Sequence, residues 1–87
     1  MSYIFNFRYK PSTNIGVLNE FIKIQKLKWK ARKILLNGDI HVRFISSIVD
    51  VRIVKDNIQK IKDAGVSIDS IECDNGEYIS NCTDFEY

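Results

Sequence analysis

The chain has 87 residues, which is the length of one domain, and 45% of them are hydrophobic, a fraction that excludes intrinsic disorder. Its net charge of +2 hides an asymmetry, since residues 1–43 hold nine Lys and Arg against two acids and residues 44–87 hold four against nine. The apolar runs are too short to cross a membrane, and Arg8 and Lys10 interrupt any signal-peptide core, so we expect a single cytoplasmic domain over residues 1–87.

Residues 2–10 alternate with a period of two, which predicts a β-strand. Arg8 and Lys10 lie on one face of this strand. The other face is aromatic, and we expect it to form core under a helix, with stacking on nucleic-acid bases as the alternative. The aromatic residues are Tyr3, Phe5, Phe7 and Tyr9.

The most biased stretch follows, and its spacing predicts one long helix from about Asn14 to Asn37. Cations recur along one helical stripe and apolar residues along the opposite stripe. Asn37 and Gly38 supply residues that tolerate a left-handed helix end. Six cations and no acid surround Trp29 in this stretch: Lys23, Lys26, Lys28, Lys30, Arg32 and Lys33.

A second apolar set on this helix does not fit one buried face. It includes Leu18, Ile22, Trp29 and Leu36. One interpretation is that these residues contact a partner or a second copy of the chain, because an apolar surface rimmed by charge is typical of such a site. The other is that Lys and Arg stems extend past a wide buried face.

The chain from Ile40 to Val54 alternates again, with a change of phase near Ser46 and Ser47. This pattern predicts two antiparallel strands joined by a tight turn, or one long strand bent by a bulge. Asp56 is then the predicted N-cap of a second helix over residues 57–64, which Gly65 ends.

Strands are predicted over Val66 to Cys73 and over Glu77 to Cys82, joined by a turn at Asn75-Gly76. Residues 83–87 read as a loose acidic tail. The whole order predicts an α+β protein of ferredoxin-like type, β-α-β-β-α-β, with an antiparallel sheet, two helices on one face and a short extra C-terminal strand.

Few residues of this chain suggest reactive chemistry. Cys73 and Cys82 do not have the spacing of a zinc site, and we expect both to be reduced and partly buried. His41 reads as a solvent-facing residue of a strand. No phosphate-binding glycine loop or catalytic motif is present, so we expect neither an enzyme nor a bound cofactor or metal.

The basic stretch favours a nucleic-acid-binding function, with RNA favoured over DNA. The six cations would contact phosphates, Trp29 would be available for stacking, and Arg8 and Lys10 would add charge near the start of the basic helix. The plain alternative is that a lysine-rich helix face serves only solubility.

In its short length and its abundance of Ile, Lys, Asn and Asp, the chain resembles the small accessory proteins of T-even-type phages. That resemblance implies a second hypothesis, an inhibitor or adaptor that binds and disables a host protein, such as a defence or toxin–antitoxin ribonuclease, possibly through RNA. The opposite charges of the two halves also predict a homodimer.

Overall fold

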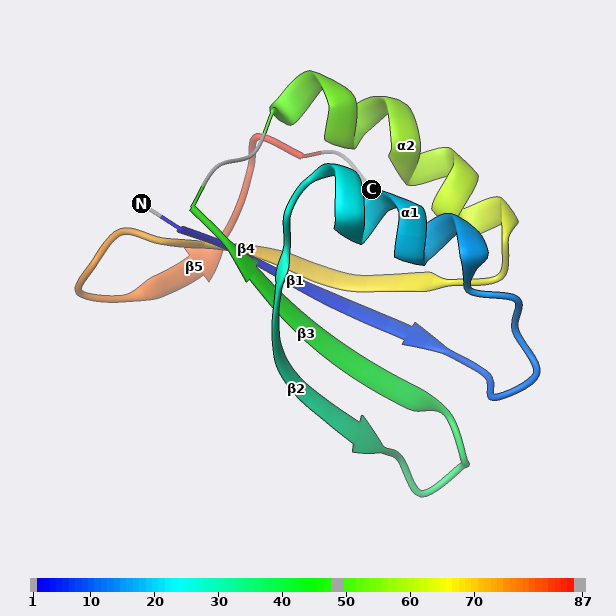
Figure 1. The fold of residues 1–87 in the computed structure, drawn as a ribbon. Helices are drawn as coiled ribbons and strands as arrows, with labels where there is room; N and C mark the ends of the chain where they lie inside the picture. The colour runs from blue at the N-terminus through cyan, green and yellow to red at the C-terminus, as the bar shows by residue number, and fades with distance from the viewer. Residues whose placement is uncertain (1, 48–49, 86–87) are drawn as a thin grey trace.

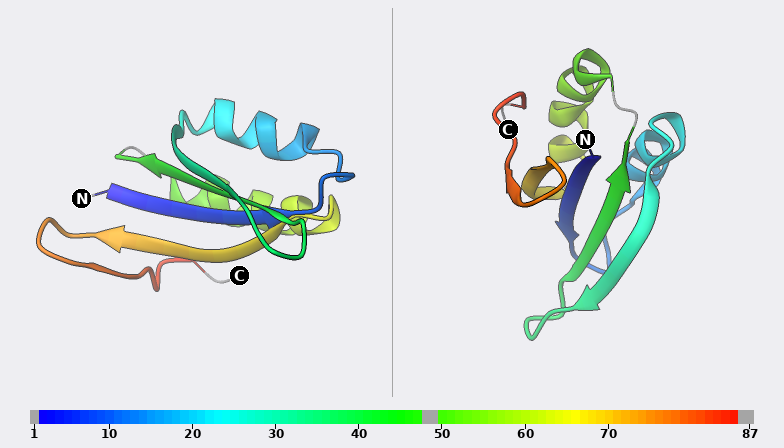
Figure 2. Two further views of the ribbon diagram at one scale, coloured as in Figure 1. Left: turned by 90° about the horizontal axis from the view of Figure 1, so that it is seen from below. Right: turned by 90° about the vertical axis from the view of Figure 1, so that its left-hand side faces the viewer.

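The computed structural model describes residues 2–47 and 50–85 and shows an α+β fold (Figure 1). The elements are β1 (Ser2–Tyr9), α1 (Gly16–Ile24), β2 (Lys28–Ile34), β3 (Ile40–Ser46), α2 (Val51–Asp63), β4 (Ser67–Asp74) and β5 (Ile79–Asn81). All neighbouring strands are antiparallel, in the order β2-β3-β1-β4-β5. Both helices cover one face of the sheet, and the other face is open (Figures 1 and 2).

The core lies between the helices and the aromatic face of the central strand β1. Phe5 and Phe7 are 0% and 1% exposed, and Phe21 of α1 meets both rings edge to face. From α2, Val54 and Ile61 complete the packing. The alternation of residues 2–10 therefore predicted both the strand and its buried face correctly.

The first helix is much shorter than the sequence predicts, because the chain reverses direction at Lys26. This residue has a φ of 54°, which is left-handed. The N–H of Leu27 donates to the carbonyl of Ile22 at 3.0 Å, and that of Lys26 donates to Lys23 at 3.2 Å. These two bonds make a Schellman motif, which ends a helix by satisfying its last carbonyls. Leu27, which follows this turn, is buried in the hydrophobic core and so fixes the turn.

The second half of the predicted basic helix is a strand. β2 pairs with β3 from Lys28 opposite Ile45 to Ile34 opposite Ile40. Lys, Ala and Arg are good helix formers, so the local preference of residues 28–34 opposes the observed strand. Pairing with β3 supplies a ladder that local preference does not report, and it decides the conformation. The helix predicted from about Asn14 to Asn37 is therefore correct only over α1 and wrong beyond it.

The second helix begins six residues earlier than predicted. Asp50 is its N-cap and accepts a hydrogen bond from the N–H of Arg52 at 3.0 Å, whereas Asp56 lies inside α2. The strand predicted to end at Val54 is wrong over residues 51–54, and residues 48–49 lie outside the described part of the chain. Gly65, with a φ of 93°, ends the helix as expected.

The C-terminal segment is packed against the core over its described part. Phe85 is 4% exposed and meets the rings of Tyr3 and Phe5, so the predicted loose tail is wrong for residues 83–85; residues 86–87 lie outside the described part. Cys73 and Cys82 form a disulfide rather than two thiols. The expected β4 and β5 strands are confirmed, with slightly shifted ends.

The α+β class, the antiparallel sheet and its two helices are as expected from the sequence. The ferredoxin-like expectation does not match in placement, because the second strand and the second helix lie at other residues. The short extra C-terminal strand was expected, and it is β5, at the end of the sheet order β2-β3-β1-β4-β5. In the part of the chain that the structure describes, no helix is both long and apolar enough to cross a membrane.

Candidate nucleic-acid interface

The edge strand β2 carries the densest positive charge of the protein. Its sequence, KWKARKI, places four cations on seven consecutive residues, and every one of the seven is exposed. No other strand of the described chain pairs with its outer side. At about 3.3 Å per residue the strand is roughly 20 Å long, which is long enough to follow several phosphates of an extended single strand.

Cations of this strand project from both faces of the sheet. Pairing with β3 places Lys28 and Lys33 on the open face, with their partners Ile45 and His41. Arg32 lies on the helix side, opposite Val42. The register shifts between Trp29 and Ala31, which leaves Lys30 at a bulge. Such bulges redirect side chains on edge strands, so the charge surrounds the edge instead of covering one face.

These cations have no carboxylate partner among the described residues. The ion pairs found there join Arg8 and His41 to Asp69, Arg43 to Glu72, and Arg52 to Asp50. None of them includes a residue of β2. The acidic groups of the second half of the chain therefore do not neutralise the basic strand within the described part of the protein.

Trp29 is an exposed aromatic residue in the middle of this charge. Its side chain remains 57% exposed, although its ring meets Phe44 edge to face at 5.4 Å. The contact with the buried Phe44 positions the indole and leaves more than half of the side chain exposed. An aromatic ring among cations is the combination that proteins use to stack a base beside its phosphate.

A shallow depression of about 400 Å³ lies at the start of the strand. Lys26 and Lys28 line it together with Ile45 and three serines, Ser2, Ser46 and Ser47. The ammonium groups of the two lysines and the hydroxyls of Ser2 and Ser47 are donors that phosphate oxygens accept from, whereas Ser46 is only 5% exposed. The depression is therefore the most specific feature of the basic edge. Sequence analysis assigned the two lysines to the site but missed the serines, which come from distant segments.

Other predicted contact residues are spread around the molecule. Lys23 is exposed on α1, and Lys10 is exposed just after β1. Arg8 lies on the open face of the sheet, where Asp69 holds it at 3.4 Å. It is therefore partly neutralised and contributes less positive charge than the residues of β2 do.

The residues predicted to contact a partner also differ in where they lie: some are buried in the core and others are exposed. Leu18 is 1% exposed and belongs to the core, so its assignment to a partner surface is wrong. Ile22 is half-buried and packs on the core. Leu36, in the turn after β2, is fully exposed, as is much of Trp29. The exposed apolar groups near the basic edge are thus Trp29, Ile34 and Leu36.

The middle of the open face holds a polar network that sequence analysis missed. Asn6 of β1 is 3% exposed and accepts a hydrogen bond from Nε of Arg43 at 2.9 Å. Its amide donates to Ser70 at 2.8 Å and to Glu72 at 3.3 Å. The network joins basic β3 to acidic β4 across the central strand. The sequence signal for it is the polar residue Asn6 between Phe5 and Phe7 in the central strand.

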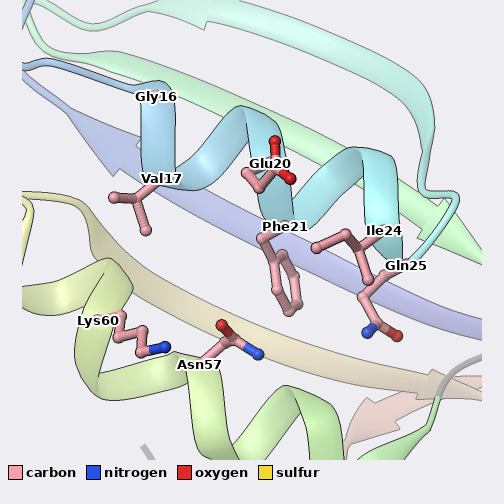
Figure 3. A pocket seen from close by; sticks show the side chains of 8 residues that line it. All are labelled: Gly16, Val17, Glu20, Phe21, Ile24, Gln25, Asn57 and Lys60. Carbon is pink, nitrogen blue, oxygen red and sulfur yellow. The ribbon is translucent and has the colours of Figure 1, made fainter.

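A groove of about 480 Å³ lies between α1 and α2 (Figure 3). Phe21 and Gln25 point from α1 toward α2, and Val17 and Ile24 extend its apolar lining. Its charged residues, Glu20 and Lys60, come from separate helices. The groove carries no concentration of one charge, so we place the candidate interface on β2.

Comparison of the chain with protein-family models, with curated proteins and with solved structures finds no match.

Proposed function

We propose that this protein is a small non-enzymatic nucleic-acid-binding protein of the cytoplasm that holds single-stranded RNA along its edge strand β2. The observation that carries the proposal is a fully exposed strand with four cations, none of them in an ion pair within the described chain, around an exposed Trp29. Phosphates would lie along the cations, and a base would stack on the free part of the indole.

An edge strand rich in Lys has a simpler explanation, which the experiment must separate from binding. Charged side chains on an edge discourage two sheets from joining edge to edge. That role requires only that the strand carries charge, at whichever positions. It does not require an exposed tryptophan among the cations, or two lysines beside Ser2 and Ser47 in a depression, and these two features support binding.

The experiment measures the affinity of a fluorescently labelled oligouridine for the full chain at several salt concentrations. Four to five phosphate contacts predict a slope of log affinity against log salt of about −3, since single strands lose about 0.7 per contact. Replacing Lys30, Arg32 and Lys33 by Gln should reduce that slope by about 2. Labelled DNA of the same length tests whether RNA is favoured.

A matched control carries the same loss of three charges elsewhere. Lys55, Lys60 and Lys62 are exposed on α2, away from the sheet edge, and their replacement by Gln should leave the slope close to that of the wild-type protein. Equal losses in both variants would show that net charge alone drives binding. A flat salt response in the wild-type protein would overturn the proposal.

A second candidate function is binding to a protein, and the apolar groups on the same edge favour it. Trp29, Ile34 and Leu36 are exposed beside unpaired backbone groups of β2, a surface onto which an acidic strand of a partner could add. The resemblance to phage accessory proteins, which stays a prediction, favours a host protein as that partner. A homodimer, for which the opposite charges of the two halves of the chain speak, is the related proposal. Light scattering at low and high salt tests the homodimer, which should dissociate at high salt.

A further inference from the structure

Three potential metal ligands gather at the sheet edge opposite the basic strand. Cys73 comes from β4, and Cys82 and Asp84 come from the segment after β5. Their Sγ and carboxylate oxygen atoms all lie within 4.8 Å of one another, and Sγ of Cys82 is 3.8 Å from Oδ2 of Asp84. Nothing in the proposed RNA interface uses these residues.

Strand pairing alone does not bring these three residues together. Cys73 faces Ser80 across the β4–β5 ladder, so Cys82 lies beyond its direct partner position. The chain bends back after β5, where the N–H of Cys82 donates to the carbonyl of Ile71 at 2.8 Å. Phe85, buried against Tyr3 and Phe5, holds the following residues in place. The position of Asp84 is thus fixed on both sides.

The spacing suits a tetrahedral cation. With bonds of about 2.3 Å to sulfur and about 2.1 Å to oxygen, ligand atoms around zinc lie roughly 3.5–3.8 Å apart. The separation of 3.8 Å between Cys82 and Asp84 already meets this requirement. The two cysteine Cα atoms are 5.0 Å apart, so rotation of the side chains can place the two sulfurs at a similar separation once they are not bonded.

We propose that the reduced protein binds a thiophilic divalent cation of the zinc class through Cys73, Cys82 and Asp84. A dithiol reductant supplies two electrons and two protons to the disulfide and is itself oxidised, which gives two thiols. Binding of the cation then displaces one proton from each thiol, and two sulfur–metal bonds form. The disulfide and the cation therefore compete for the same two sulfur atoms.

Burial and exposure divide the proposed site into a closed side and an open side. Cys73 and Cys82 are 7% and 5% exposed, whereas Asp84 is exposed. The apolar surroundings of the sulfurs favour the neutralising bond to a cation over two free thiolates. A water molecule would complete the coordination on the solvent side, next to Asp84. Either the disulfide or the cation would tie the segment that carries Phe85 to β4.

The test uses the full chain with Co²⁺ as a spectroscopic probe and Zn²⁺ as competitor. After reduction with a phosphine and confirmation of two free thiols, one equivalent of Co²⁺ should produce thiolate-to-metal absorption in the near ultraviolet, and Zn²⁺ should abolish it. The oxidised protein should give no such absorption. A reduced wild-type protein with two free thiols and no absorption would overturn the proposal.

Variants separate the three-residue site from a bare pair of thiols. Cys82→Ser should abolish the absorption. Asp84→Asn should weaken Co²⁺ binding at least about tenfold, because even residues outside the direct ligands cost 10–100-fold. Glu77→Gln, in the exposed turn between β4 and β5, removes a carboxylate outside the cluster and should bind as the wild type does.

Folding of each variant is checked by circular dichroism. Asp84 is exposed, so Asp84→Asn remains a valid test even if Cys82→Ser fails to fold. Equal Co²⁺ affinity in Asp84→Asn and the wild type would overturn the three-residue site.

Discussion

The two edges of the sheet differ in charge, in exposure and in how they are held. β2, at one edge, has four cations and seven exposed residues, and it is held by its ladder with β3 and by the ring contact between Trp29 and Phe44. The other edge, β5 and the segment after it, is tied down by a disulfide and by the buried ring of Phe85. One edge is therefore left exposed, whereas the other is fastened to the core.

The largest expected effect is on the free energy of unfolding, when one aromatic residue from each edge is replaced by alanine. Phe85→Ala removes a side chain that is 4% exposed and should lower the free energy of unfolding by about 3–4 kcal/mol. Trp29→Ala removes a larger side chain that is 57% exposed, and it should cost only about 1 kcal/mol, the value of one edge-to-face ring pair. Urea unfolding measures both losses of stability, provided that the unfolding free energy depends on urea concentration with the same slope in the variants and in the wild type.

Binding should respond in the opposite order. Trp29→Ala should weaken oligouridine binding by about 1–3 kcal/mol, the value of one stacked base, and Phe85→Ala, measured well below its unfolding midpoint, should leave it unchanged. Equal stability losses in the two variants would show that the edges do not differ as the structure indicates.

The second-largest expected effect is the loss of stability when the disulfide is reduced. Cys73 and Cys82 are nine residues apart, and release of a loop of that size should lower the free energy of unfolding by about 2–3 kcal/mol. The double variant Cys73→Ala/Cys82→Ala is the control, because its stability should not respond to reductant. Affinity for oligouridine should be the same in both redox states, since β2 lies across the sheet from the bond. A change in affinity on reduction would show that the two edges are coupled.

The third effect concerns the polar network between the two edges. Asn6→Leu removes the amide that bonds to Arg43, Ser70 and Glu72, so each of these partly buried residues loses one hydrogen-bond partner, although Arg43 and Glu72 keep their ion pair. The expected cost is about 2 kcal/mol, within the range for an unsatisfied buried partner. Ser70→Ala removes one acceptor only and should cost about 1 kcal/mol. Thermal unfolding of the two variants compares them. A neutral Asn6→Leu would indicate that water replaces the amide.

Sequence analysis succeeded where a local signal agreed with the fold. Alternation gave β1 and β3, and Gly65 gave the end of α2 because glycine readily adopts a left-handed conformation. The end of α1 has the same two hydrogen bonds, but a lysine occupies the left-handed position. Lysine has no preference for that conformation, so nothing local marks the end of the helix at Lys26.

The candidate site was predicted in composition but not in shape. The cations and Trp29 could be identified from the sequence, because charge does not depend on conformation. Their arrangement depends on pairing with β3, a non-local interaction that helix preference opposes. The disulfide also depends on a non-local feature, the bend after β5 that brings Cys82 back to β4. Spacing alone cannot show such a bend.

The smallest expected effect is the change in stability caused by substitutions at the residues that end the two helices. It tests whether the basic stretch is one continuous helix or is interrupted, as in the structure. Lys26→Gly should raise the free energy of unfolding by about 0.5–1 kcal/mol, because glycine adopts the left-handed conformation without the strain of a Cβ atom. Gly65→Ala should lower it by about 1 kcal/mol through that same strain, since the added methyl meets Thr13 only at 3.5 Å, an ordinary contact. Urea unfolding midpoints give both values.

Lys23→Gly provides the control, since it removes the same charge three residues earlier, within α1, where glycine should cost up to about 1 kcal/mol. Opposite signs for Lys26→Gly and Lys23→Gly require a helix that stops between these residues and a strand that can start at Lys28. If both substitutions destabilise the protein equally, Lys26 is helical. The cations would then form one helical stripe, and the exposed basic edge on which RNA binding is proposed would not exist.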